Sequence, residues 1–325
     1  MGSLVTEEDY KIHRSVIYSI VLIFEFIGLF GNVNLVIVIL RNKSLKSKFG
    51  LIMASLALFH TFCLLFELVN MGFGIAATFY SYRINRSTCF YSTFPIILFH
   101  CLQTGTICIL SFDLFLAILV PFRYRTFHID WYFPMLYALP VCYGLGILIA
   151  GWVTLDDSQI AMCNPPGSVI PTVTGWWYKL MSVFSILTIV FYSSAFILLS
   201  WKVSHHNTDI RLIERRALRT LQVLIVTFLF TRFISTAVGT AVSLLKVNSE
   251  YAALVFNYNV IPAMIAYSQN AYVCFFRSTE YRRLLTEQMS RYIPFVYHIL
   301  PVKPSDRSTT RAHFGAAGPG ITVKF

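Results

Sequence analysis

A small set of polar side chains lies inside long apolar stretches of the sequence, where such groups could bind a ligand. Glu67 is an acid and Arg232 a base, while His100 and Gln103 stand one helical turn apart in another apolar stretch. Ionisable groups are costly in a hydrocarbon layer and by default mark a functional site there. Arg232 is the most unusual of them. Its candidate partners supply charge or hydrogen-bonding groups: Glu25, Glu67, His100, Gln103, Asn257 and Asn259.

Several of these groups have two interpretations that stay open. Arg232 could hold an anionic or carbonyl-bearing ligand through its guanidinium, or it could be a polar lock that only fixes helix packing. Glu25 could extend its carboxylate to water at the membrane edge, or it could be buried. Trp176, Trp177 and Tyr178 suit the headgroup level of a membrane. At most one or two of these three rings should line a pocket, and Trp177 is the candidate.

The elements that must position these groups are apolar helices. The chain of 325 residues is 56% hydrophobic and only 13% charged, with a mean hydropathy of +0.65. It therefore has too few polar groups to cover a soluble surface. Runs of about 20 apolar residues cross a membrane as helices, whereas a β-barrel needs alternation. We predict an all-α membrane protein, a bundle of seven transmembrane helices at 15–40, 50–77, 90–120, 132–152, 176–201, 217–245 and 251–276.

The basic residues are distributed unevenly, which orients the chain. Of 26 Lys and Arg, 19 lie in the loops after the first, third and fifth runs or in the tail, 6 lie on the other side, and one lies within a helix. Because basic loops stay in the cytosol, the N-terminus is predicted outside and the tail inside. The net charge of +11 then suits anionic membrane lipid and an acidic cytosolic protein rather than nucleic acid.

The sequence also predicts how the chain divides. Residues 1–14 form a short extracellular N-terminus, 15–276 the transmembrane domain, 277–300 a cytosolic helix and 301–325 a disordered tail. Apolar residues alternate with arginines over 279–292, as in an amphipathic surface helix. No metal or cofactor site is predicted.

The cysteines fall into two groups. Five of the seven lie within the apolar runs and suit packing: Cys63, Cys101, Cys108, Cys142 and Cys274. Cys89 and Cys163 instead lie at outer loop ends, on the oxidising side of the membrane. Asn85 opens an Asn-Arg-Ser glycosylation sequence on that side. We therefore predict that Asn85 is glycosylated.

Several motifs resemble one receptor superfamily. Residues 113–125 resemble the inner end of the third helix in rhodopsin-like G-protein-coupled receptors, and Gly31-Asn32 resembles the Gly-Asn pair of their first helix. The stretch 275–283 narrows the resemblance to the nematode serpentine chemoreceptors of the Srsx type. This resemblance implies a plasma-membrane receptor that binds a small molecule or short peptide among its helices. It also implies signalling to a heterotrimeric G protein, with arrestin as a further partner.

The resemblance assigns roles to individual residues. It implies a disulfide between Cys89 and Cys163, and it places His100 and Gln103 at the depth of the ligand. The amide of Asn32 is expected to hydrogen-bond across helices. The resemblance further implies a basic cytosolic surface that meets the G protein or arrestin, made of Asp113, Arg123, Tyr124, Arg125, Arg215, Arg216 and Arg219. The alternative is that positive-inside topology alone accounts for these charges.

Two positions depart from the superfamily's pattern. Leu114 replaces the arginine of Asp-Arg-Tyr, so Asp113 needs another partner, for which Arg123 or Arg125 is the candidate. His60 stands where most members keep an acid that helps to hold sodium. Imidazole is a poor ligand for a hard cation that prefers oxygen. We expect no sodium site, and we expect His60 to be a hydrogen-bonded interior histidine.

Two other classes of protein share some of these features. His60, Glu67, His100 and Arg232 inside the membrane also suit a ligand-gated channel or a transporter, although no inverted repeat or pair of broken helices is evident. A seven-span hydrolase would need a convergent set of metal-binding side chains. The two intramembrane histidines do not supply one, so we predict that the chain is not an enzyme.

Overall fold

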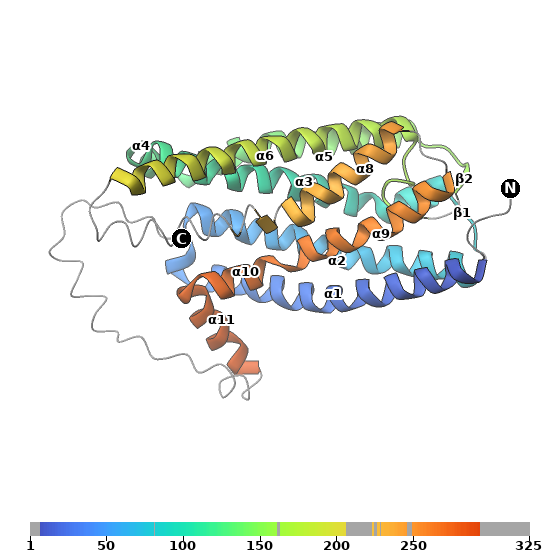
Figure 1. Cartoon of the computed structure of the whole chain (residues 1–325), viewed down its shortest axis with the longest axis horizontal. Helices are drawn as coiled ribbons and strands as arrows, with labels where there is room; N and C mark the ends of the chain where they lie inside the picture. The colour runs from blue at the N-terminus through green and yellow to red at the C-terminus, as the bar shows by residue number, and fades with distance from the viewer. Residues whose placement is uncertain are drawn as a thin grey trace.

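The computed structural model describes residues 7–80, 82–160, 163–205, 223, 226–227, 229–245 and 249–292. Helices dominate this part of the chain (Figure 1). The elements in chain order are α1 (Glu7–Arg41), η1 (Lys43–Leu45), α2 (Lys48–Phe79), β1 (Ile84–Asn85), α3 (Arg86–Leu119), α4 (Pro121–Thr126), α5 (Ile129–Val153), β2 (Gln159–Ile160), α6 (Pro171–His205), the π-helix η2 (Leu229–Phe233), α8 (Ile234–Leu245), α9 (Ser249–Ser268), α10 (Asn270–Arg277) and α11 (Thr279–Tyr292).

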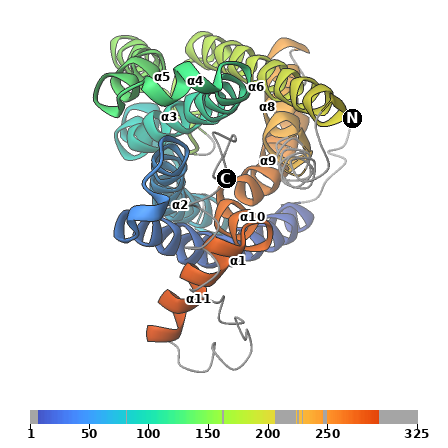
Figure 2. The ribbon, with the colours of Figure 1, turned by 90° about the vertical axis from the view of Figure 1, so that its left-hand side faces the viewer.

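The long helices lie side by side and form a closed ring. Figure 1 shows them running along the length of the molecule, and Figure 2 looks along their axes. α1 packs against α2 and α9, α3 packs against α2 and α6, and α8 connects α6 to α9. α5 packs against the α3 and α6 side of this ring. Side chains from distant parts of the sequence can therefore meet inside the bundle.

Within the described residues, five helical segments are long and apolar enough to cross a membrane: Lys11–Arg41, Lys48–Phe79, Arg86–Leu119, Ile129–Val153 and Pro171–Trp201. They match the first five predicted runs, which are confirmed as apolar helices of that length. The sixth predicted run, 217–245, lies partly outside the described residues. The seventh, 251–276, falls on α9 and α10, with Gln269 between the two helices.

The first and last described helices, α1 and α11, can be compared with the predicted N-terminal segment and the predicted amphipathic helix. α1 already begins at Glu7, so part of the predicted N-terminal segment 1–14 continues the first helix, because residues 7–14 contain no glycine or proline to stop it. α11 coincides with the predicted amphipathic stretch 279–292. Its buried residues join a core cluster with α1 and α2: Tyr281, Leu284 and Leu285. A helix with one buried apolar face is confirmed there. Residues 293–325, with the predicted tail, lie outside the described residues.

Small residues bring neighbouring helices close together. A Cβ atom on Gly31 of α1 would lie 3.1 Å from the Cβ of Ala271 in α10. The adjacent Asn32 donates its amide to the carbonyl oxygen of Tyr267 in α9, at 2.8 Å. The expected cross-helix role of Gly31-Asn32 is confirmed. A Cβ atom on Gly105 would lie 2.4 Å from Cγ of Pro140, so α3 and α5 can approach this closely only with a glycine at that position.

Candidate ligand-binding site

A disulfide holds a loop over one end of the bundle. Cys89, in the first turn of α3, is bonded to Cys163, and their Cα atoms lie 5.5 Å apart. The predicted bridge is confirmed. Just before it, β1 and β2 pair antiparallel, with Ile84 opposite Ile160. The bridge and the strand pair together hold the segment 163–166 against the start of α3.

Charged side chains also tie the loop to α3. Arg86 forms an ion pair with Asp156, and the Asp156 carboxylate accepts hydrogen bonds from the hydroxyl and the backbone N–H of Ser158. The Ser158 bonds, together with the Arg86 charge, hold the pKa of Asp156 below its ordinary value. Asn85 is exposed immediately before α3. Its side chain is therefore accessible, and its glycosylation stays a prediction.

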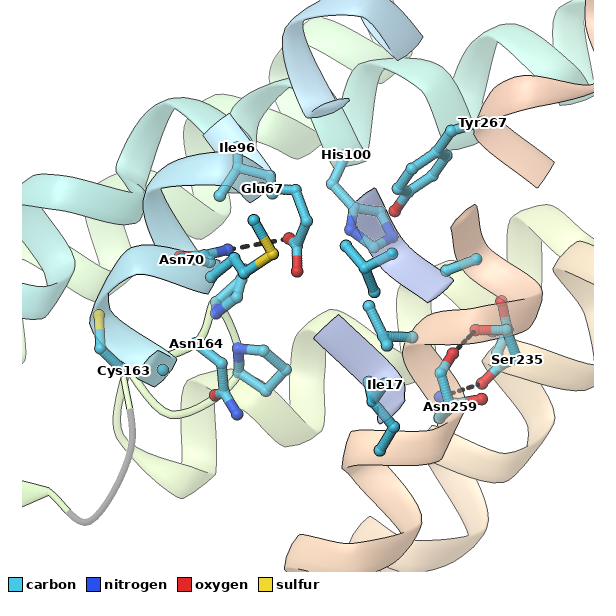
Figure 3. Close-up of a pocket in the computed structure, with 18 of the residues that line it drawn as sticks. Ile17, Glu67, Asn70, Ile96, His100, Cys163, Asn164, Ser235, Asn259 and Tyr267 are labelled. Atoms are coloured by element: carbon cyan, nitrogen blue, oxygen red, sulfur yellow. Dashed lines mark hydrogen bonds between the residues drawn. The ribbon is translucent and has the colours of Figure 1, made fainter. Parts of the chain in front are cut away.

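A cavity of about 160 Å³ lies beneath this loop. Its walls come from α1, α2, α3, α6, α8, α9 and the segment 163–166 (Figure 3). A cavity of about this size in a protein core accommodates a single aromatic ring. The charged groups among its described lining residues are Arg14 and Glu67. The cavity is therefore large enough for a small organic molecule and is mostly apolar around it.

Glu67 of α2 points into this cavity (Figure 3). Asn70, one turn further along α2, donates its side-chain amide to Oε2 of Glu67 at 3.0 Å. The other carboxylate oxygen makes no hydrogen bond within the described residues. Arg14 is engaged elsewhere, because its guanidinium donates to the Thr78 hydroxyl at 2.6 Å. Glu67 therefore has an oxygen available for a donor on a ligand.

Aromatic side chains lie across the open space from Glu67 (Figure 3). The His100 ring of α3 packs edge-on against Trp177 and Tyr267, with ring centroids 5.3 Å and 6.2 Å apart respectively. Nε2 of His100 is buried and has no hydrogen-bond partner within the described residues. Aromatic faces attract cations as well as other rings. An acid opposite aromatic rings is suited to a small ligand that carries a positive charge.

The cavity gathers some of the predicted ligand residues and not others. Four of them line it: Glu67, His100, Trp177 and Asn259. Gln103 and Arg232 are not among its lining residues, and the side chain of Asn257 lies outside the described part of the chain. Sequence reasoning missed Asn70 and Tyr267. Asn70 stands one turn after an intramembrane acid, which was a usable signal, but a tyrosine in an apolar run carried none.

Arg232 points into the bundle rather than toward lipid. It is 2% exposed, and its Nη2 donates to the Thr104 hydroxyl of α3 at 2.5 Å. The prediction of an interior arginine bonded to the third helix is confirmed, but Thr104 was not among the candidate partners. Asn259, which was a candidate, instead donates its amide to the Ser235 carbonyl at 3.0 Å. Arg232 lies in η2, and π-helical turns are frequent at functional sites.

The sequence also made predictions about the burial of His60 and Glu25, and the structure can be compared with both. His60 is 2% exposed, and the Asn270 amide donates to its Nδ1 at 2.8 Å. The expectation of a hydrogen-bonded interior histidine is confirmed. Glu25 is 1% exposed, and neither of its carboxylate oxygens has a hydrogen-bond partner within the described residues. It is therefore buried in the bundle and does not extend to water.

At the opposite end of the bundle, Asp113 is buried instead of lying on the basic surface. It is 2% exposed and accepts hydrogen bonds from the hydroxyls of Tyr124, at 2.9 Å, and Tyr132, at 2.7 Å. The expectation that Arg123 or Arg125 pairs with it is wrong. Both arginines are exposed and form no ion pair within the described residues. The physical reason is that a tyrosine hydroxyl is cheaper to desolvate than a guanidinium.

Neighbouring residues complete this cluster. Lys48 lies over the Tyr124 ring, 4.3 Å from its centroid. Burial and the adjacent carboxylate raise the pKa of Tyr124, so its hydroxyl remains a donor.

Leu114 is 4% exposed and packs in an apolar cluster with Tyr192, so the superfamily's arginine position is apolar here. The remaining candidates for the basic surface lie outside the described residues: Arg215, Arg216 and Arg219.

Removing one hydrogen bond from Asp113 should weaken this end of the bundle. We expect Tyr132→Phe to lower the free energy of unfolding by about 2 kcal/mol, because a buried carboxylate loses a donor. Thermal unfolding of the purified protein measures the change. Tyr91→Phe is the matched control, since Tyr91 is 53% exposed, and it should leave the melting temperature unchanged. Equal melting temperatures for Tyr132→Phe and wild type would contradict the expectation.

The fold and the site together define a class of protein. Apolar helices long enough to cross a membrane surround a ligand-sized cavity under a disulfide-held loop, which is the architecture of a multi-pass helical membrane protein. Residues 25–289 match the family described as Serpentine type 7TM GPCR chemoreceptor Srsx. The chain therefore belongs to this family, and the resemblance inferred from its motifs is confirmed. No curated protein matches the chain.

Proposed function

We propose that this protein is a chemosensory G-protein-coupled receptor of the plasma membrane, with seven transmembrane helices and its N-terminus outside. It binds a small ligand within the helix bundle and signals to a heterotrimeric G protein in the cytosol. The observation that carries the proposal is the cavity beneath the disulfide-held loop, where an acid faces aromatic rings in a chain of a chemoreceptor family.

The cavity favours a small molecule with a basic nitrogen over a short peptide. Its volume of about 160 Å³ is close to that of cavities that bind one aromatic ring. Glu67 offers a carboxylate oxygen to an ammonium group, and a charge-assisted hydrogen bond of this kind is stronger than a neutral one. His100, Trp177 and Asn259 then contact the remainder of the ligand. A peptide would have to extend well beyond this space.

The opposite, basic end of the bundle is the proposed contact for the cytosolic partner. The exposed Arg123 and Arg125 stand on either side of Tyr124, and the basic residues Arg215, Arg216 and Arg219 would extend their surface. Asp113 supports it from within by holding Tyr124 in place. The partner on this surface is a G protein or arrestin, and anionic lipid contacts the same charges.

A ligand screen on cells that express the receptor tests the proposal. The screen compares small amines with neutral and acidic counterparts of the same size and reads cAMP, cGMP and calcium. We expect responses that disappear when a non-hydrolysable GDP analogue blocks the G protein. His100→Ala should abolish them, whereas Cys142→Ala, at an exposed position of α5, should not.

The channel class predicts a different result. The purified chain in a planar bilayer without any G protein would then carry a ligand-gated current. Such a current would overturn the receptor proposal, because signalling through a G protein requires the partner to be present.

A further inference from the structure

The glycosylation sequence that opens at Asn85 is part of the folded start of α3. Asn85 is the second residue of β1 and pairs with Gln159 of β2. The next two residues, Arg86 and Ser87, already lie in the first turn of α3. All three residues of the acceptor sequence therefore belong to regular structure, whereas glycan acceptors of this kind are normally found in surface loops.

The disulfide-held loop also engages the side chains of this sequence. Ser87 donates its hydroxyl to the carboxylate of Asp157, and the guanidinium of Arg86 pairs with Asp156. The backbone N–H of Arg86 donates to the carbonyl oxygen of Ser158, at 2.9 Å. The acceptor motif includes a hydroxyl two residues after the asparagine, so the glycan-transferring enzyme has to bind that hydroxyl. In the folded chain the hydroxyl is already bound to Asp157.

The disulfide keeps this segment closed. Cys89 lies two residues after Ser87 and is bonded to Cys163. Both cysteines are buried and pack with Ile84 in a small apolar cluster. Releasing Ser87 to an enzyme thus requires local opening of the strand pair and of the first turn of α3. The bridge restricts this opening, because it ties the two segments together.

The side chain of Asn85 nevertheless has room for a glycan that is already attached. It is exposed, and it makes no capping hydrogen bond to the start of α3. An oligosaccharide on its nitrogen would therefore extend into solvent and leave the contacts of Arg86 and Ser87 in place. The folded structure accepts the product of the modification while it hinders the reaction.

We propose that Asn85 is glycosylated only before the loop closes, and that formation of the Cys89–Cys163 bridge ends this period. In the transfer, the amide nitrogen of Asn85 forms a bond to the anomeric carbon of an oligosaccharide, and the bond from that carbon to a lipid pyrophosphate breaks. The lipid pyrophosphate leaves, and the amide proton passes to a base of the enzyme. Chains that close early therefore stay unmodified. The inference rests on the orientation in the proposed function, because the loop must face the side of the membrane on which glycans are added.

Supplying the glycan donor after folding tests this order of events. The full-length chain is synthesised into microsomes depleted of the lipid-linked oligosaccharide, with or without dithiothreitol, and the donor is then restored. Gel mobility before and after endoglycosidase treatment gives the modified fraction. We expect little modification of wild type under oxidising conditions and a severalfold larger fraction under reducing conditions, because the reduced chain lacks the bridge. Asn85→Gln should remove the signal.

Two variants open the loop by different routes. Cys163→Ser removes the bridge, and Asp157→Ala releases the hydroxyl of Ser87. Each should accept a glycan after folding under oxidising conditions, so the test does not depend on one variant. Tyr132→Phe is the matched control, because it weakens the opposite end of the bundle, and it should accept as little as wild type.

Three results would overturn the inference. The first is that oxidised wild type accepts the glycan after folding as readily as the reduced chain. The second is that Tyr132→Phe accepts as much as Cys163→Ser, since general instability would then account for the effect. The third is that Asp157→Ala accepts no more than wild type.

A second acceptor sequence separates this inference from the proposed orientation. Asn42-Lys43-Ser44 lies at the opposite end of α2 from Asn85, so only one of the two faces the side where glycans are added. A glycan on Asn42 with none on Asn85 would overturn the orientation in the proposed function and this inference with it. No glycan at either position under any condition would overturn this inference alone.

Discussion

Replacing Cys163 with serine is expected to prevent most of the receptor from reaching the cell surface. The Cys89–Cys163 bridge spans a sequence separation of 74 residues, and closing a loop of that length in the unfolded chain is worth about 4 kcal/mol in the chain-entropy treatment. Many proteins have a total unfolding free energy of about 5–15 kcal/mol, so this loss is a large fraction. Both sulfur-bearing residues are also buried, at 0% and 2% exposed.

Surface labelling of intact cells measures the expected loss, together with thermal unfolding of the detergent-purified protein. Cys89→Ser should reproduce the defect, and the double substitution should add little to it, because each single change already removes the whole bridge. Cys142→Ser is the matched control, since Cys142 is a free and exposed cysteine. A Cys163→Ser receptor that reaches the surface as efficiently as Cys142→Ser would contradict the expectation.

Replacing Glu67 with glutamine is expected to reduce the potency of basic ligands by about 30-fold or more while leaving expression intact. Losing one member of a buried charge pair costs about 2–5 kcal/mol, and 1.4 kcal/mol corresponds to a tenfold change. Expression should survive because glutamine keeps the shape of the side chain and an oxygen for the Asn70 amide, which now bonds Oε2 at 3.0 Å.

Three probes of equal size separate the charge of Glu67 from its shape. Phenethylamine, 2-phenylethanol and phenylacetate present a cationic, a neutral and an anionic group on the same ring. The Glu67→Gln change should weaken the response to the amine selectively. Glu287→Gln, which removes a surface pair with Arg283, serves as the control. Equal losses for the amine and the alcohol would show that Glu67 supports the fold rather than receives a charge.

Residue type and spacing were enough to predict the first five apolar helices of this protein. A membrane helix satisfies its own backbone hydrogen bonds, so a run of apolar residues determines the helix without help from distant contacts. This is why the five described spans match the predicted runs. Gly31-Asn32 and the stretch 279–292 were readable for a similar reason, because close helix approach and an amphipathic face are local patterns. Family membership followed from equally local motifs.

The pairing of polar side chains was decided only by the tertiary structure. Arg232 bonds the hydroxyl of Thr104, a residue 128 positions away, although the candidate partners in the sequence were acids, amides and a histidine. Asp113 bonds Tyr124 and Tyr132 rather than a neighbouring arginine. Each choice depends on the rotation of packed helices and on the direction in which their side chains point, and neither follows from residue spacing alone.

The division between cavity and core has the same origin. His100 and Gln103 lie one turn apart on α3, yet the first lines the ligand cavity and the second does not. Sequence spacing places both on nearby faces of one helix. Which of the two meets open space is set by the neighbours that pack against α3, because side chains from the other helices fill the space around Gln103 and leave it open beside His100.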